Sequence, residues 1–251
     1  MTPDFPRLAL AARRCSAAYI MDEEAAIAAF RALGSVVLGR VSNGRRQAIA
    51  HRGPDNGAYV TIAGTRFSEG PISDRLSDLR RDIDWTPKDV GDGIKVATGA
   101  DDGLADLWRW ALGYFDGGEK INGEGHSLGG WETYYMPLHV PAERIGSLVT
   151  IEPPRPANAA YWARYADVLP KITTLAHGRD PWFPWAWGQT ELRHPPGRSI
   201  IWLHDGGWSA VTEAEWCDAT GLPEVNLALH ESDHGPDSVV SALGLLARDL
   251  R

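Results

Sequence analysis

Residues 120–130 carry the pattern that decides the fold, and they read Lys-Ile-Asn-Gly-Glu-Gly-His-Ser-Leu-Gly-Gly. Residues 125–129 fit G-x-S-x-G, between a short predicted strand around 120–122 and a predicted helix. In that context the serine lies on a sharp, strained turn, and side chains two positions before and two after Ser127 would collide with neighbouring backbone. A chain with 27 glycines can also produce this spacing in any turn. The flanking strand favours the first interpretation, in which Ser127 is a nucleophile.

Short apolar runs alternate with helical segments along the rest of the chain. Strands are expected at 58–63, 145–151, 171–176 and 199–203. Helices are expected at 23–33, 103–115 and 238–250, where apolar residues recur at helical spacing. This alternation predicts an α/β fold, with a mostly parallel central sheet flanked by helices.

Two more strands are expected before the first buried one. The runs 36–41 and 47–51 are separated by Ser42-Asn43-Gly44, and an Asn-Gly pair suits a tight hairpin turn. The sequence therefore predicts two antiparallel strands at the N-terminal edge of the sheet.

The composition sets limits on organisation and partners. With 251 residues, 43% of them hydrophobic, the chain is typical of one globular unit, and we expect a single domain over residues 1–251. A formal charge of −8 and a pI of about 5.5, without clustered Lys and Arg, exclude a nucleic-acid partner. Cys15 and Cys217 are too few for a disulfide framework and are expected to be free thiols.

The N-terminal region predicts no targeting signal. Its apolar stretch, 8–12, is interrupted by Arg13 and Arg14 before a signal-peptide core could form. No later window approaches the roughly 18 apolar residues that a membrane-spanning helix needs. We therefore expect a soluble, cytoplasmic protein.

The segment 66–92 is rich in charge but contains one amphipathic stretch. Its apolar residues share a helical face, and they are Ile72, Leu76, Leu79 and Ile83. The segment could be a surface helix or a lid over a site.

A serine nucleophile needs a histidine base and an orienting carboxylate, in the chain order Ser, Asp or Glu, His. Three histidines lie late enough: His204, His230 and His234. The first two end apolar runs, and His204 is more simply a strand-end residue with a structural hydrogen bond. His234 lies in a turn before the last helix and is the preferred base.

Two aspartates compete for the orienting role. Asp180 follows the strand 171–176, at the edge where such sheets place their active sites, although it could also be an ordinary Asp-Pro turn residue. Asp205 follows the next strand and is the main alternative. Asp233 is too close to His234 in the sequence to be preferred.

Several motifs, in this order, resemble those of the class 3 lipase family, the fungal-lipase-like branch of the α/β-hydrolase fold. They are Ala63-Gly64-Thr65, GHSLGG at 125–130, TIEPPRPANAAYWARY at 150–165, HGRDPWFPW at 177–185 and Asp233-His234. The resemblance runs from about residue 15 to residue 240. It implies the triad Ser127, Asp180 and His234, with the Thr65 and Leu128 amides as oxyanion donors. The Thr65 role rests on the resemblance, whereas a helix N-terminus after Ser127 independently favours Leu128.

The chain departs from the family at positions that concern the substrate. Ala63 replaces the family's Arg, Ala97 takes the place of its usual His, and the segment after Thr65 is charged rather than apolar. These differences argue against activation at a lipid interface, and they make a water-soluble ester as good a candidate as a lipid ester. Transient contact with a lipid surface would depend on the lid.

Aromatic residues gather just after Asp180. Trp182, Phe183 and Trp185, with Trp187 beyond them, could form an apolar rim for an acyl chain or could pack a long loop. The sequence leaves both interpretations open.

The sequence thus predicts a serine carboxylic-ester hydrolase, a lipase or esterase, that works through an acyl-enzyme. No metal or organic cofactor is expected, because the histidines lack zinc-ligand spacing and no phosphate-binding glycine loop is present. Two alternatives stay open. One is a non-catalytic binding module on the same fold, and the other is an acyltransferase, which shares the acyl-enzyme.

Overall fold

A computed structural model describes residues 2–42, 46–64, 86–184, 191–197, 199–205, 207–221 and 235–249. Its centre is an eight-stranded mixed sheet with the order β1-β2-β3-β6-β7-β8-β9-β10. The strands are β1 (Val36–Ser42), β2 (Gln47–Arg52), β3 (Ala58–Ile62), β6 (Ile121–His126), β7 (Ile145–Ile151), β8 (Ile172–His177), β9 (Ile200–His204) and β10 (Gly207–Val211). Strands β3, β6, β7, β8 and β9 run parallel, while β1 and β2 at one edge and β10 at the other are antiparallel. The predicted α/β architecture, with its antiparallel N-terminal edge, is confirmed.

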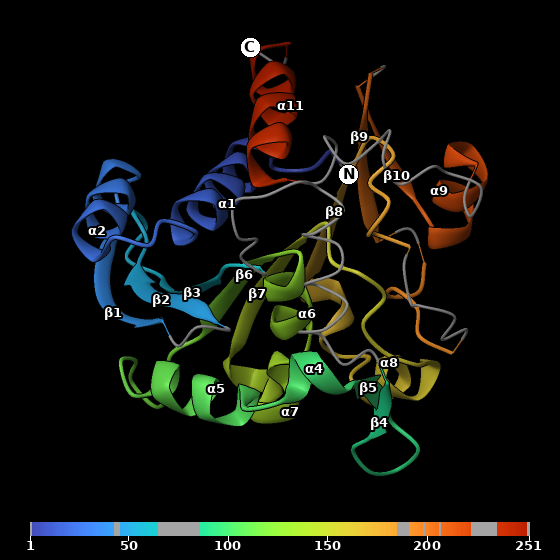
Figure 1. The fold of residues 1–251 in the computed structure, drawn as a ribbon, viewed down its shortest axis with the longest axis horizontal. Coiled ribbons are helices and arrows are strands. Elements are labelled where there is room, and N and C mark those ends of the chain that lie inside the picture. Colours follow the sequence, from blue (N-terminus) through green and yellow to red (C-terminus); the bar gives the residue numbers. More distant parts are fainter. Residues whose placement is uncertain are drawn as a thin grey trace.

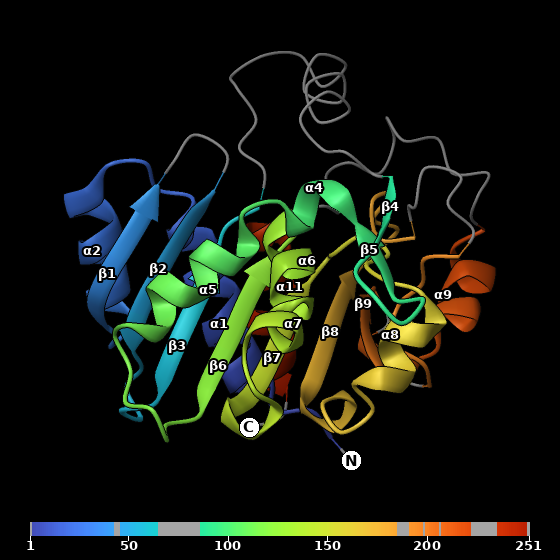
Figure 2. The ribbon, with the colours of Figure 1, turned by 90° about the horizontal axis from the view of Figure 1, so that it is seen from below.

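Helices cover both faces of the sheet (Figures 1 and 2). One face carries α1 (Phe5–Ala18) and α11 (Pro236–Asp249), with α2 (Glu23–Ala32) toward the β1 edge. The other face carries α5 (Leu104–Leu112), α6 (Leu128–Tyr134), α7 (Met136–His139) and α8 (Ala159–Arg164). An apolar core lies between the sheet and each helical layer, as a parallel sheet requires.

Helix α1 was not among the predicted helices. Its apolar face, Phe5, Leu8, Ala12 and Cys15, packs on the sheet and against Val239 and Leu243 of α11. The Asp4 side chain accepts the Arg7 N–H at the first turn, so the helix is capped. The arginines that interrupt the apolar stretch do not break the helix, because Arg is a good helix former, and Arg14 is tolerated in the core because it is buried against an acidic partner.

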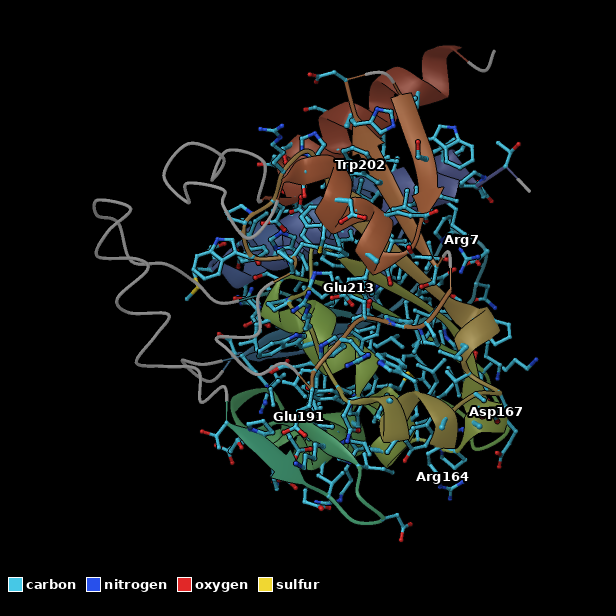
Figure 3. The ribbon with its side chains drawn as sticks, turned by 90° about the vertical axis from the view of Figure 1, so that its right-hand side faces the viewer. Arg7, Arg164, Asp167, Glu191, Trp202 and Glu213 are labelled. Carbon is cyan, nitrogen blue, oxygen red and sulfur yellow. The ribbon has the colours of Figure 1, made fainter. Side chains whose placement is uncertain are left out.

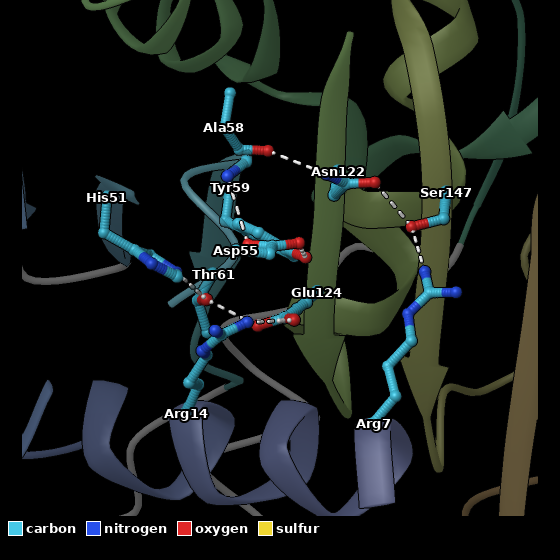
Figure 4. Close-up of polar contacts among 11 residues, drawn as sticks. Arg7, Arg14, His51, Asp55, Ala58, Tyr59, Thr61, Asn122, Glu124 and Ser147 are labelled. Atoms are coloured by element: carbon cyan, nitrogen blue, oxygen red, sulfur yellow. Dashed lines mark hydrogen bonds and ion pairs between the residues drawn. The ribbon is translucent and has the colours of Figure 1, made fainter. Parts of the chain in front are cut away.

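That partner belongs to a buried polar network beneath α1 (Figure 4). Arg14 donates to Glu124 on β6 at 2.9 Å, and the Thr61 hydroxyl donates to the other Glu124 oxygen at 3.0 Å. His51 Nε2 lies 2.9 Å from the same hydroxyl, and the Arg14 guanidinium lies 4.5 Å from the centre of the Tyr59 ring. Burial raises the pKa of Glu124, and it lowers the pKa of His51 to about 3. The network ties α1 to strands β2, β3 and β6.

Smaller elements complete the part of the chain that the structure describes. They are the hairpin β4 (Pro87–Asp89) and β5 (Lys95–Ala97), the short helices α4 (Thr98–Asp101), η1 (Ala142–Arg144) and η2 (Leu169–Lys171), and α9 (Glu213–Thr220). The end of the proposed lid segment, 86–92, contains β4 and the turn that follows, whereas 66–85 lies outside the described residues. Strand β10 and helix α9 were not predicted.

The first half of the short segment 191–197 is held by contacts to two other elements, and Figure 3 labels Glu191 and Glu213, which take part in them. Lys95 of β5 forms an ion pair with Glu191 at 2.8 Å, and Glu213 at the start of α9 accepts the His194 N–H at 2.8 Å. Between these contacts the Arg193 N–H donates to the Ala157 carbonyl. The segment therefore joins the β4–β5 hairpin to α9.

Two sequence-based predictions concern chemical state and membrane association. Cys15 and Cys217 are free thiols, as predicted. Among the described residues, no helix combines the length and apolar character that crossing a membrane requires.

Candidate active site

Ser127 lies on a strained turn between β6 and α6. Its φ of 54° and ψ of −121° are unusual for a residue with a side chain, and such a conformation costs on the order of 1–3 kcal/mol. The turn is fixed because the Ser127 N–H donates to the Ile151 carbonyl at 2.8 Å, while the Ser127 carbonyl accepts from Gly130 and Trp131 of α6. The residue is buried, with 8% of its surface exposed. This geometry is the one that G-x-S-x-G predicts.

The glycines around Ser127 are required by close backbone approach. A Cβ atom at Gly125 would overlap the Gly129 carbonyl, and one at Gly129 would overlap the Ile62 carbonyl of β3. A Cβ atom at Gly64 would lie 2.8 Å from the Ser127 Cβ, so the end of β3 packs directly against the serine. The predicted collisions two positions before and after Ser127 are confirmed.

His126, which precedes Ser127, is a buried residue in a chain of hydrogen bonds. Its Nδ1 lies 2.6 Å from the Tyr19 hydroxyl, which accepts the Gly64 N–H at 2.8 Å. Its Nε2 lies 3.1 Å from Oε2 of Glu152, and the same oxygen accepts the Gly235 N–H at 2.9 Å. The chain thus connects the ends of three segments around Ser127.

Glu152 is the least expected member of this group. It directly follows β7, is fully buried, and has a φ of 50°. Burying a carboxylate costs free energy, and so does holding its residue in a left-handed backbone conformation. The contacts of Glu152 must offset both costs. Glu152 lies in the motif at 150–165 but had no predicted role, and nothing marked Tyr19, since positive φ and contacts between distant residues leave no local signal. His126 is different, because it is part of the nucleophile motif itself.

Asp180 lies at the carboxyl end of β8, two strands from β6. It is fully buried, and its Oδ1 accepts the Trp182 N–H at 2.9 Å. Its competitor Asp205 is exposed in the turn between β9 and β10. His204, the alternative base, lies 3.0 Å from the Ser209 hydroxyl across the same hairpin, the structural bond expected of it.

The remaining predicted site residues divide into described and undescribed ones. Leu128 is the first residue of α6, directly after Ser127. His230, His234, Thr65, Trp185 and Trp187 lie outside the described residues. The chain neighbours of two of them are placed: Gly64, before Thr65, and Gly235, after His234, both belong to the hydrogen-bond chain.

The two described aromatics after Asp180 are both buried. Phe183 stacks on His194 with ring centres 4.0 Å apart and meets the Trp216 ring edge-on at 4.9 Å. Trp182 belongs to the core between the sheet and helices α5 to α8. Of the two interpretations of these aromatics, packing accounts for the described contacts of Phe183.

The whole fold is similar to those of fungal lipases. Lipase II from Rhizopus niveus is 17% identical, with a TM-score of 0.67 over 92% of each chain. The triacylglyceride lipase of Rhizomucor miehei is 16% identical, with a TM-score of 0.63 over 94% of this chain and 97% of that one. A triacylglycerol lipase whose catalytic centre is a serine protease triad is 18% identical, with a TM-score of 0.66 over 92% and 94%.

No protein-family model and no curated protein matches the sequence. The structural comparisons confirm the likeness to class 3 lipases that the motifs indicated, as a likeness of fold. The chain has the α/β-hydrolase fold of these enzymes.

Proposed function

We propose, from the fold shared with fungal lipases and the turn at residue 127, that this protein is a serine carboxylic-ester hydrolase. The observation that carries the proposal is the strained, buried Ser127, with Gly64 packed against it. A backbone strain of this kind persists only where the surrounding structure imposes it, and such strain clusters at active sites.

In the proposed reaction, Ser127 attacks the ester carbonyl while His234 accepts its proton. Asp180 orients the imidazole and stabilises its charged form. The tetrahedral intermediate is held by the Leu128 and Thr65 amides, and it collapses to an acyl-enzyme with loss of the alcohol. Water, activated by the same histidine, then releases the acid.

Several contacts support these roles. Asp180 is buried at the carboxyl end of a parallel strand, where active sites of such sheets lie, whereas Asp205 is exposed. The residues next to Thr65 and His234 are joined to His126, beside Ser127, by hydrogen bonds. Binding of an acyl chain by Trp182, Phe183 and Trp185 stays a prediction, as does a lid within 66–92.

The test combines covalent labelling with hydrolysis. We expect a fluorophosphonate probe to label the wild-type protein at Ser127, and we expect nitrophenyl esters in a chain-length series to be hydrolysed. Ser127→Ala should abolish both without unfolding the protein. A folded wild-type protein that is neither labelled nor active would contradict the proposal and would favour a non-catalytic binding module. Product analysis with an added alcohol separates a hydrolase from an acyltransferase.

A further inference from the structure

The hydrogen-bond chain beside Ser127 has a consistent direction. With a neutral imidazole, the Tyr19 oxygen receives the Gly64 N–H and the Tyr19 hydroxyl donates to Nδ1 of His126, because the Glu152 carboxylate accepts and so requires the hydrogen on Nε2. The imidazole then carries its hydrogen on Nε2 and donates it to Oε2 of Glu152, which also receives the Gly235 N–H. In this arrangement every contact has one donor and one acceptor. Burial raises the pKa of Tyr19, which keeps the phenol protonated as a donor.

Three members of this chain each stand next to a proposed catalytic or oxyanion residue in the sequence. Gly64 precedes Thr65, His126 precedes Ser127, and Gly235 follows His234. These three segments come from different parts of the sequence. A single carboxylate oxygen, Oε2 of Glu152, receives both His126 and Gly235.

We propose that Glu152 is a positioning residue, which holds the segment of the base in register with the serine turn by accepting hydrogen bonds from His126 and Gly235. Tyr19 performs the same task between His126 and the oxyanion segment. The unfavourable left-handed backbone of Glu152 is consistent with this role, because it aims the carboxylate beneath the serine turn. This inference rests on the proposed function, but its central claim concerns geometry and can be measured separately.

The experiment compares Glu152→Leu with Glu152→Gln. Leucine removes the acceptor, whereas the glutamine oxygen can accept both hydrogen bonds without the charge. For Glu152→Leu we expect kcat to fall by about tenfold or more with KM little changed, since a displacement of about 1 Å costs up to roughly a hundredfold. The rate of fluorophosphonate labelling should fall in parallel. Glu152→Gln should recover most of this loss.

A matched control is available in Glu213. It also accepts a backbone N–H, from His194, and a side-chain donor, from Arg155, but on α9. Glu213→Leu should lower the melting temperature without slowing turnover. Amide exchange supplies the second readout: the Gly235 amide should exchange faster in Glu152→Leu than in wild type and in Glu152→Gln.

The outcomes separate this inference from the proposed function. If the wild type is labelled and Glu152→Leu retains its kcat and its slow Gly235 exchange, Glu152 does not position the base. The same conclusion follows if Glu152→Gln is as slow as Glu152→Leu, because the charge rather than the bridging acceptor would then matter. If the wild type is never labelled, the hydrolase proposal fails, and Gly235 exchange still decides whether Glu152 holds that segment.

Tyr19→Phe covers the case in which Glu152→Leu does not fold. The phenylalanine keeps the ring but removes the hydroxyl that joins Gly64 to His126. We expect a lower kcat and faster exchange of the Gly64 amide, and an unchanged value of both would overturn the Tyr19 link.

Discussion

Arg14 of helix α1 donates a hydrogen bond of 2.9 Å to Glu124 of strand β6, and both side chains are buried. Glu124 stands three residues before Ser127 on the strand that leads into the serine turn. Charged groups removed from water are tolerated only when they are paired. The contact therefore fixes the first described helix to the central strand.

Breaking this pair should destabilise the protein strongly. Glu124→Gln and Arg14→Met are each expected to lower the free energy of unfolding by about 3–5 kcal/mol, because each leaves an uncompensated buried charge or unmet donors. The double variant should lose clearly less than the sum of the two. Urea denaturation of all four proteins measures this. Additive losses would mean that the pair is not energetically coupled.

His51 should make stability depend on pH in mildly acid solution. Burial lowers its folded pKa from 6.5 to about 3, so the folded state binds fewer protons than the unfolded state between these values. The stability of the folded state that depends on a neutral His51 is fully present above the unfolded pKa of 6.5 and is lost as the pH falls toward 3. His51→Gln should therefore reduce the slope of unfolding free energy against pH by up to about 1.4 kcal/mol per pH unit between roughly pH 6 and pH 4. An identical slope in wild type and variant would contradict the assignment.

Asp180 and His234 should act as one unit. Asp180→Asn and His234→Ala are each expected to reduce turnover by roughly a thousandfold or more, because the imidazole loses its orientation or is absent. Combining them should add little, since losses within a triad are strongly non-additive. Asp205→Asn, at an exposed turn, is the control and should leave turnover close to wild type. If Asp205→Asn lost turnover while Asp180→Asn stayed active, Asp205 and not Asp180 would be the orienting acid.

Gly129 should tolerate no side chain. In Gly129→Ala the new methyl group would overlap the Ile62 carbonyl, so β3 and α6 must separate. We expect a loss of about 1–3 kcal/mol in unfolding free energy together with most of the esterase activity. Gly244→Ala in α11, where nothing lies within 4 Å of an added Cβ, should instead stabilise the protein slightly. Thermal unfolding and ester hydrolysis compare the two alanine variants directly.

The parts of the fold that could be predicted are those with local signals. The antiparallel runs 36–41 and 47–51, the buried run 58–63 and the glycines around Ser127 each carry their signal within a few residues. Helix α1 could not be predicted this way, because Arg14 is compatible with the core only through Glu124, 110 residues later. Glu152 was missed for the same reason: its contacts with His126 and Gly235 arise only after the sheet has formed.

The pairing of α1 with α11 limits how early this side of the core can close. Phe5, Leu8 and Cys15 share one apolar cluster with Val239 and Leu243, and Ser16 donates to Asp237 at 2.6 Å. During synthesis on the ribosome, the part of α1 that packs on α11 cannot be covered until the chain has been made through Leu243. Until then only the sheet can cover the apolar face of α1, so this side of the core closes late in folding.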